Sequence, residues 1–223
     1  MLDLPEYIIR DEVCEDFRTK TYRGWSKKRH APVLIKVPKH ETVSLSDISS
    51  LVYEYEVARD LEIEGIVRAV ELVEASSTLA VVLEDTGALP LGRYTKGKAV
   101  HIHDFFDLAL RLAEILGRLH RKGLVHRNLC PETIFVHPES GKVSITGFAM
   151  EVQTENLKLV IESVNPAYMA PEQTGLTAYG VDHRTDLYSL GIVFYQLLTG
   201  RLPLEATSPA GWIWVLTTQE PSA

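Results

Sequence analysis

The stretch LVHRNLCPETI, residues 124–134, has strong secondary-structure signals on both sides. Before it, apolar residues recur at three- and four-residue steps from Phe105 onward, which predicts a helix that ends at Gly123. After it, the apolar runs 134–136 and 143–145 have the length of short strands on either side of a turn. The stretch is therefore expected to be a loop between a helix and a strand pair.

The sequence before residue 90 has the pattern of a small sheet around one helix. Four apolar or β-branched runs have strand length, at 7–9, 33–37, 67–73 and 79–83. Between them, one apolar helix face is formed by Ile48, Leu51, Val52, Tyr55, Ala58 and Leu61. Glycine and turn residues fill 87–98, and beyond them further helices are expected at 186–199 and around 210–216. We thus expect a sheet-rich part, a hinge and a helical part.

The composition is that of a globular chain. Of the 223 residues, 45% are hydrophobic and 24% are charged, which suffices for one large domain with a core. The net charge of −7 disfavours nucleic acid and anionic membranes as partners. No run approaches the roughly 18 apolar residues of a membrane span. Cys14 and Cys130 are far apart and lack metal-ligand spacing, so we expect a reduced, cytoplasmic chain.

Several landmarks occur in the order found in one enzyme family. They are Val33–Lys36, Glu54, the stretch 124–134, Ser144–Ala149, Ala170–Glu172 and Arg184–Gly191. Together they resemble the eukaryotic-type serine/threonine protein kinase family over essentially the whole chain. The resemblance implies an α+β, two-lobed protein-kinase-like fold, with a small antiparallel-sheet N-lobe around one main helix (1–85) and a mostly helical C-lobe (86–223). The helices that end the C-lobe in that family are missing, so this single domain is expected to be truncated.

Two stretches narrow the resemblance. Leu83-Glu84-Asp85 and the segment 168–175 look like the kinase domain that opens large bacterial multidomain sensor proteins. In those proteins an ATPase-like region and a histidine kinase follow. The resemblance therefore implies bacterial signalling, with other protein domains as partners: the downstream regions of a longer chain, or further copies of this chain.

The resemblance also assigns positions in a nucleotide cleft. Lys36 matches the family's ATP-binding lysine and Glu54 its ion-pair partner, while Glu84 and Asp85 fall beside the nucleotide. Leu34 stands where the family has a small alanine that packs on adenine, so its larger side chain would crowd the base. ATP binding is therefore expected to be weak.

The phosphate-covering loop has lost its glycines. Counted back from Tyr22-Arg23-Gly24, the glycine positions of the family hold Cys14, Asp16 and Thr19. A side chain at each position blocks the close approach of backbone N–H groups to phosphates. Asp16 also adds negative charge where a nucleotide would bring more.

The catalytic positions have changed as well. Asn128 stands at the position of the general base, and an amide has no useful basicity, which removes a contribution of about 10²–10⁴-fold in rate. Thr133 and Gly147 occupy the two metal-ligand positions, so bound Mg²⁺ is not expected. Glu132 is a nearby carboxylate that could be recruited instead.

Other matched positions are structural. His126 and Phe148 match apolar positions that link the lobes, and Asp186 matches a buried aspartate that anchors the catalytic loop. Arg127 matches an arginine that grips a phosphorylated activation loop, for which Thr154 and Ser163 are candidate acceptors. The family's partner for Glu172 would lie in the missing helices.

Three functions remain open on the sequence. The first is a catalytically impaired pseudokinase that acts as a regulatory or interaction module. The second is an active serine/threonine kinase that transfers the ATP γ-phosphate to protein hydroxyls with recruited carboxylates. The third is a switch that holds ATP through Lys36 without metal and never hydrolyses it.

Overall fold

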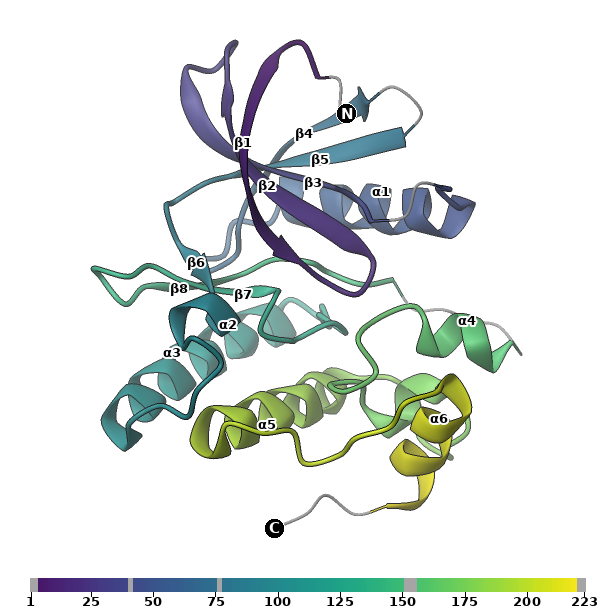
Figure 1. Ribbon diagram of the computed structural model, residues 1–223. Helices are drawn as coiled ribbons and strands as arrows, with labels where there is room; N and C mark the ends of the chain where they lie inside the picture. Colours follow the sequence, from purple (N-terminus) through teal and green to yellow (C-terminus); the bar gives the residue numbers. More distant parts are fainter. Residues whose placement is uncertain (1–3, 40–41, 76–77, 151–155, 220–223) are drawn as a thin grey trace.

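The computed structural model describes residues 4–39, 42–75, 78–150 and 156–219, and it has the expected two-lobed α+β fold (Figure 1). The N-lobe is a five-stranded antiparallel sheet in the order β1-β2-β3-β5-β4. Its strands are β1 (Tyr7–Glu15), β2 (Thr19–Ser26), β3 (Ala31–Pro38), β4 (Ala69–Ala75) and β5 (Thr78–Glu84). Helix α1 (Leu45–Arg59) packs against β4 and β5.

Helix α1 begins at a capping box. The Ser44 side chain accepts a hydrogen bond from the backbone N–H of Asp47, and the Asp47 carboxylate accepts one from the Ser44 N–H. Asp47 also forms an ion pair with Arg18, which ties the start of the helix to the turn between β1 and β2. The buried face of α1 consists of Asp47, Leu51, Glu54 and Ala58.

The C-lobe is mostly helical. Its elements are β6 (Leu89–Pro90), α2 (Leu91–Tyr94), α3 (Ile102–Arg121), β7 (Ile134–Val136), β8 (Val143–Ile145), α4 (Leu157–Ile161), a 3₁₀ helix (Pro171–Thr174), α5 (His183–Thr199) and α6 (Pro209–Thr218). The predicted helix before the loop 124–134, the strand pair after it and the two later helices are all confirmed. None of the described helices is long and apolar enough to cross a membrane.

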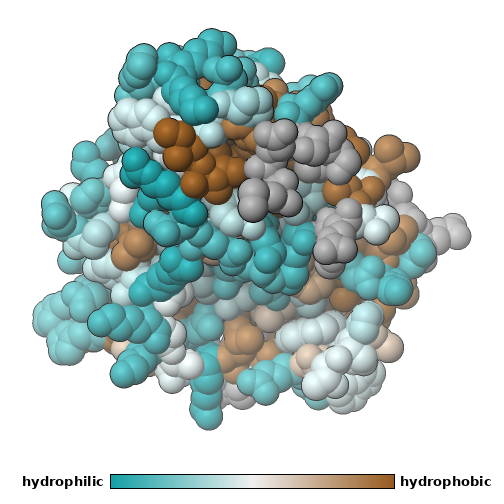
Figure 2. Space-filling view, turned by 45° about the horizontal axis from the view of Figure 1, so that its top comes forward, coloured by the Kyte–Doolittle hydropathy of each residue, from teal (hydrophilic) through white to brown (hydrophobic). Residues whose placement is uncertain are grey.

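Some elements differ from the sequence expectation. Strand β2 and the short helix α4 were not predicted, and β4 begins at Ala69 rather than Val67. The backbone N–H of Val67 instead donates to Ile145 of the C-lobe. On the face shown in Figure 2, hydrophilic residues predominate and hydrophobic residues form separate patches.

Gly65 allows the two lobes to approach each other closely. Its carbonyl accepts a 2.8 Å hydrogen bond from the N–H of Ile145, and Ile66 forms an isolated bridge with the same residue. Gly65 has φ +94°, and an added Cβ would lie 2.4 Å from Cγ1 of Ile115 on α3. Only glycine fits this backbone and this space.

We expect Gly65→Ala to lower the free energy of unfolding by about 2–4 kcal/mol, because the change adds both backbone strain and overpacking. Chemical denaturation measures the difference. Gly141→Ala is the control, since Gly141 also has a positive φ (+63°) but no atom lies within 4 Å of its added Cβ. Equal losses in the two variants would show that the contact with Ile115 has no cost.

Candidate functional site

Lys36 and Glu54 meet between the sheet and helix α1. Lys36 Nζ lies 2.9 Å from Glu54 Oε2, and both side chains are nearly inaccessible to solvent. Burial disfavours the charge on Lys36, but the carboxylates of Glu54 and Asp16 outweigh burial and raise the pKa of Lys36 above its usual value. The second Glu54 oxygen, Oε1, accepts hydrogen bonds from the Thr146 hydroxyl (2.9 Å) and the Gly147 N–H (2.8 Å). The pair thus connects both lobes.

The turn between β1 and β2 folds onto its own aspartate. Asp16 Oδ1 accepts hydrogen bonds from the N–H groups of Arg18 (2.8 Å) and Thr19 (2.6 Å). Its other oxygen, Oδ2, accepts the Thr19 hydroxyl at 2.7 Å and lies 3.5 Å from Lys36 Nζ. A carboxylate of the chain therefore binds the loop N–H groups and the lysine that the resemblance assigns to a nucleotide's phosphates.

The three replaced catalytic positions lie together and bond to one another's backbone. Asn128 Nδ2 donates to the Gly147 carbonyl at 2.9 Å. The Thr133 hydroxyl hydrogen-bonds with the carbonyls of Asn128 (2.8 Å) and Cys130 (3.1 Å). Gly147 has φ +83°, and an added Cβ would lie 2.7 Å from Cγ2 of Thr133. These contacts occupy the side-chain amide nitrogen of Asn128 and the hydroxyl of Thr133.

Asp186 anchors the loop 124–134. It is fully buried, and its carboxylate accepts the backbone N–H groups of His126 and Arg127, each at 2.8 Å. The ring of His120 is also within 2.8 Å of Oδ2. The His126 ring packs on Phe148 with centroids 4.7 Å apart, and burial lowers the pKa of His126. The structure thus brings together the four positions that the resemblance assigns to structural roles: His126, Arg127, Phe148 and Asp186.

A family model described as the protein kinase domain matches residues 18–219. The chain belongs to the protein kinase family.

Relatives of known name support this membership. The chain is 30% identical over 216 residues to serine/threonine-protein kinase ULK1 of Homo sapiens, covering 92% of this chain and 20% of that protein. It is 28% identical over 208 residues to a probable serine/threonine-protein kinase of Clostridium acetobutylicum, covering 91% and 31%. Serine/threonine-protein kinase pkn2 of Myxococcus xanthus is 28% identical over 209 residues, covering 87% and 24%. The chain therefore spans less than a third of the length of these relatives.

In this kinase domain Leu34, at the position that the resemblance places against adenine, is buried. Leu34 is 2% exposed and belongs to the main apolar cluster, which also includes Phe135. Arg23 binds Asp85 at 2.6 Å and donates to the Ala88 carbonyl at 2.8 Å, so an ion pair ties β2 to the hinge. Sequence reasoning missed Arg23, because its role depends on the register of β2.

Some predicted site residues lie elsewhere. Glu84, which the resemblance places beside the nucleotide, lines a cavity that does not include Lys36. Glu132 lines a cavity with Tyr168 and Gln196, and burial raises its pKa. In the described part of the chain it does not line the cavity at Lys36 either.

The remaining predicted positions concern the segment after Gly147. Glu172 accepts a 2.6 Å hydrogen bond from the Thr185 hydroxyl. Ser163 and Arg127 line one small cavity, and the Ser163 hydroxyl donates to the Val160 carbonyl. Thr154 lies outside the described residues.

Little space remains where a nucleotide would carry its phosphates. The cavity lined by Asp16, Lys36, Glu54, Asn128 and Gly147 holds about 40 Å³. Among the described residues, no group of three or more His, Cys, Asp or Glu side chains is arranged to hold a metal ion.

Proposed function

We propose that this protein kinase domain is catalytically impaired and acts as a regulatory or interaction module. The observation that carries the proposal is the position of Asp16. Its carboxylate accepts the hydrogen bonds of the loop N–H groups and lies beside the positive charge of Lys36. Without this carboxylate, the same groups would be available to bind phosphates. A nucleotide would have to displace this carboxylate before its own phosphates gained those interactions.

The chemistry of the cleft supports the same conclusion. Phosphoryl transfer depends on positioning and on neutralising charge, with metal ions as the main neutralising groups. Thr133 and Gly147 offer no carboxylate for Mg²⁺, and Asn128 cannot accept a proton from a substrate hydroxyl. The residues present therefore do not fit a metal-bound nucleotide, and we derive no transfer step.

One observation favours the second candidate, a switch that holds ATP without metal. The ion pair between Lys36 and Glu54 is formed at 2.9 Å, as phosphate binding by this lysine requires. If the turn at Asp16 opened, Lys36 would be ready to bind α- and β-phosphates. Metal-independent stabilisation of the wild-type chain by ATP would identify this function.

A thermal-shift titration of wild type and Asp16→Gly with ATP, with and without Mg²⁺, tests the proposal. We expect no shift for wild type. For Asp16→Gly we expect ATP at about 100 times its Kd to add roughly 2.7 kcal/mol, or several degrees in Tm, since the loop N–H groups and Lys36 are released.

Asp11→Gly is the matched control, because it removes the same charge from an exposed position of β1. It should behave as wild type. Turnover of ATP by the wild type that disappears in Lys36→Met would instead establish an active serine/threonine kinase and end the proposal.

The wider role is also part of the proposal. The resemblance to bacterial multidomain sensor proteins supports a cytoplasmic module in bacterial signalling. Its partners would be other protein domains, either ATPase-like and histidine-kinase regions of a longer chain or further copies of this chain. Co-purification of the separately expressed domains measures this association.

A further inference from the structure

A second cavity, of about 300 Å³, lies behind the hinge and shares no lining residue with the cavity at Lys36. It is lined by the segment 64–68, Glu84 of β5, Thr86, helix α3 and the turn between β7 and β8. We call it the back cavity. Small-molecule sites in proteins begin at roughly this size.

The floor of the back cavity is apolar. Ile66, Ile115 and Val143 line it, and Ile115 and Val143 are only 4% and 8% exposed. Ile115 is held in place by its close packing against Gly65. An apolar group placed on this floor would leave water for a rigid, already packed surface.

The rim of the back cavity carries a small excess of positive charge. Arg118 lies 3.4 Å from a carboxylate oxygen of Glu64 and 3.7 Å from one of Glu114, so one cation lies between two carboxylates. The other charged residues that line the cavity are Arg68, Arg111, Lys142 and Glu84. Among the described residues none of these four forms an ion pair, although the Asp60 carboxylate interacts with Arg68 at longer range. The lining thus has four cations and three carboxylates, although the whole chain has a net charge of −7.

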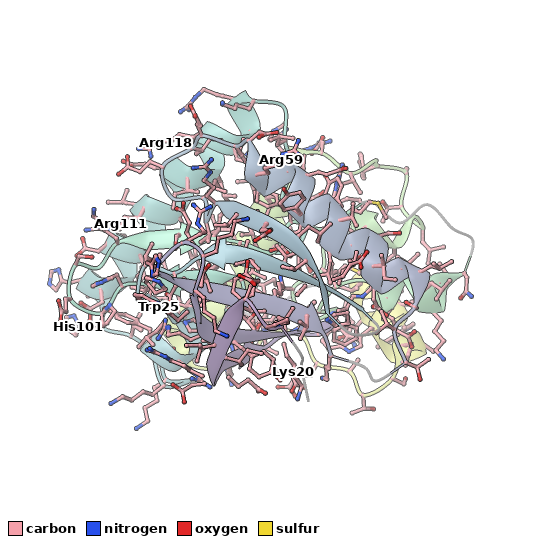
Figure 3. All side chains as sticks on the ribbon, turned by 90° about the horizontal axis from the view of Figure 1, so that it is seen from above. Lys20, Trp25, Arg59, His101, Arg111 and Arg118 are labelled. Atoms are coloured by element: carbon pink, nitrogen blue, oxygen red, sulfur yellow. The ribbon has the colours of Figure 1, made fainter. Side chains whose placement is uncertain are left out.

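The cations come from separate elements that converge on the cavity. Arg111 and Arg118 lie two turns apart on α3, and Figure 3 shows both on the same side of the molecule. Arg68 precedes β4, and Lys142 precedes β8. Guanidinium and ammonium groups that surround an apolar floor are suited to a carboxylate or phosphate on an apolar body.

We propose that the back cavity binds a small organic anion: an aromatic or branched aliphatic body that carries one carboxylate or phosphate group. The body lies on Ile66, Ile115 and Val143, and the anionic group lies between Arg111 and Lys142. This proposal does not depend on the state of the cleft at Lys36, because the two cavities have separate linings.

Occupancy would couple the two lobes. The cavity includes Glu84 at the end of β5 and Arg68 before β4, and on the other side α3 and Ser144 of β8. A ligand that contacts both lobes binds their present arrangement better than any other and so stabilises it. The back cavity would then be a sensor site in a chain whose own Asp16 occupies the loop N–H groups beside Lys36.

The test is an NMR titration of the ¹⁵N-labelled chain with phenyl phosphate, benzoate, inorganic phosphate and benzyl alcohol. We expect phenyl phosphate or benzoate to shift amide signals around the back cavity. The comparison of these two distinguishes phosphate from carboxylate. Inorganic phosphate and benzyl alcohol, which each lack one half of the ligand, should bind at least about tenfold more weakly.

Charge variants locate the binding site. Arg111→Gln and Lys142→Gln should each weaken binding about tenfold, which is the size expected for one charged hydrogen bond. Arg121→Gln is the matched control, because Arg121 is an exposed arginine at the end of α3 that does not line the cavity. Unchanged binding in the first two variants, shifts confined to other regions, or equal binding of inorganic phosphate would each overturn the proposal.

Discussion

Replacing Asp186 with alanine is expected to lower the free energy of unfolding by about 3–5 kcal/mol, because two buried backbone N–H groups lose their acceptor. These are the N–H groups of His126 and Arg127, and the carboxylate that accepts them is fully buried. Urea denaturation of the variant and the wild type measures the loss. The same change should loosen the loop 124–134, which amide hydrogen exchange would show.

Asp182→Ala is the control on the same helix. Asp182 caps α5 through the N–H of Arg184 but lies at the surface, so its loss should be much smaller. If Asp186→Ala were as mild as Asp182→Ala, the loop would be held by its packing rather than by the buried carboxylate.

Lys36→Met is expected to lower the free energy of unfolding by about 3–5 kcal/mol, because it leaves Glu54 as a buried carboxylate without its cation. Urea denaturation curves of the variant and the wild type measure the loss.

Two comparisons isolate the ion pair. Lys20→Met breaks pairs with Glu12 and Glu15 at the surface and should change stability little. The double variant Lys36→Met/Glu54→Gln should lose less than the sum of its single changes, because the amide keeps an acceptor for the Gly147 N–H without a buried charge. Additive losses would mean that the two side chains do not interact.

The order of elements was predictable because most of them carry apolar periodicity. Strand β2 does not: its buried positions are Thr19, Thr21, Gly24 and Ser26, which are small or polar and lie on both faces, so a hydrophobicity pattern does not reveal it. Helix α1 was predicted from its apolar face, yet two of its buried positions are Asp47 and Glu54. Their burial depends on partners from other elements, which no local pattern records.

The candidate site was predictable only as a set of positions. The matches of Lys36, Glu54, Asn128 and Asp186 follow from motif order. The structure pairs Lys36 with Glu54 and places the Asp186 carboxylate on the backbone of the loop 124–134. The expectation for Asp16 was repulsion of a nucleotide. Its actual bonds depend on the tight turn that brings its carboxylate to the N–H groups of residues 18 and 19. Turn geometry of this kind is not encoded by spacing alone.

The closed turn at Asp16 has a consequence for any protein that docks over the cleft. In a kinase domain whose covering loop becomes ordered only when a small ligand binds, a docking protein must itself order that loop when the ligand is absent. This ordering costs free energy and weakens docking. Here that ordering is completed when the chain folds. A docking protein thus meets a turn that is already ordered, and its affinity for this surface should not depend on the nucleotide concentration.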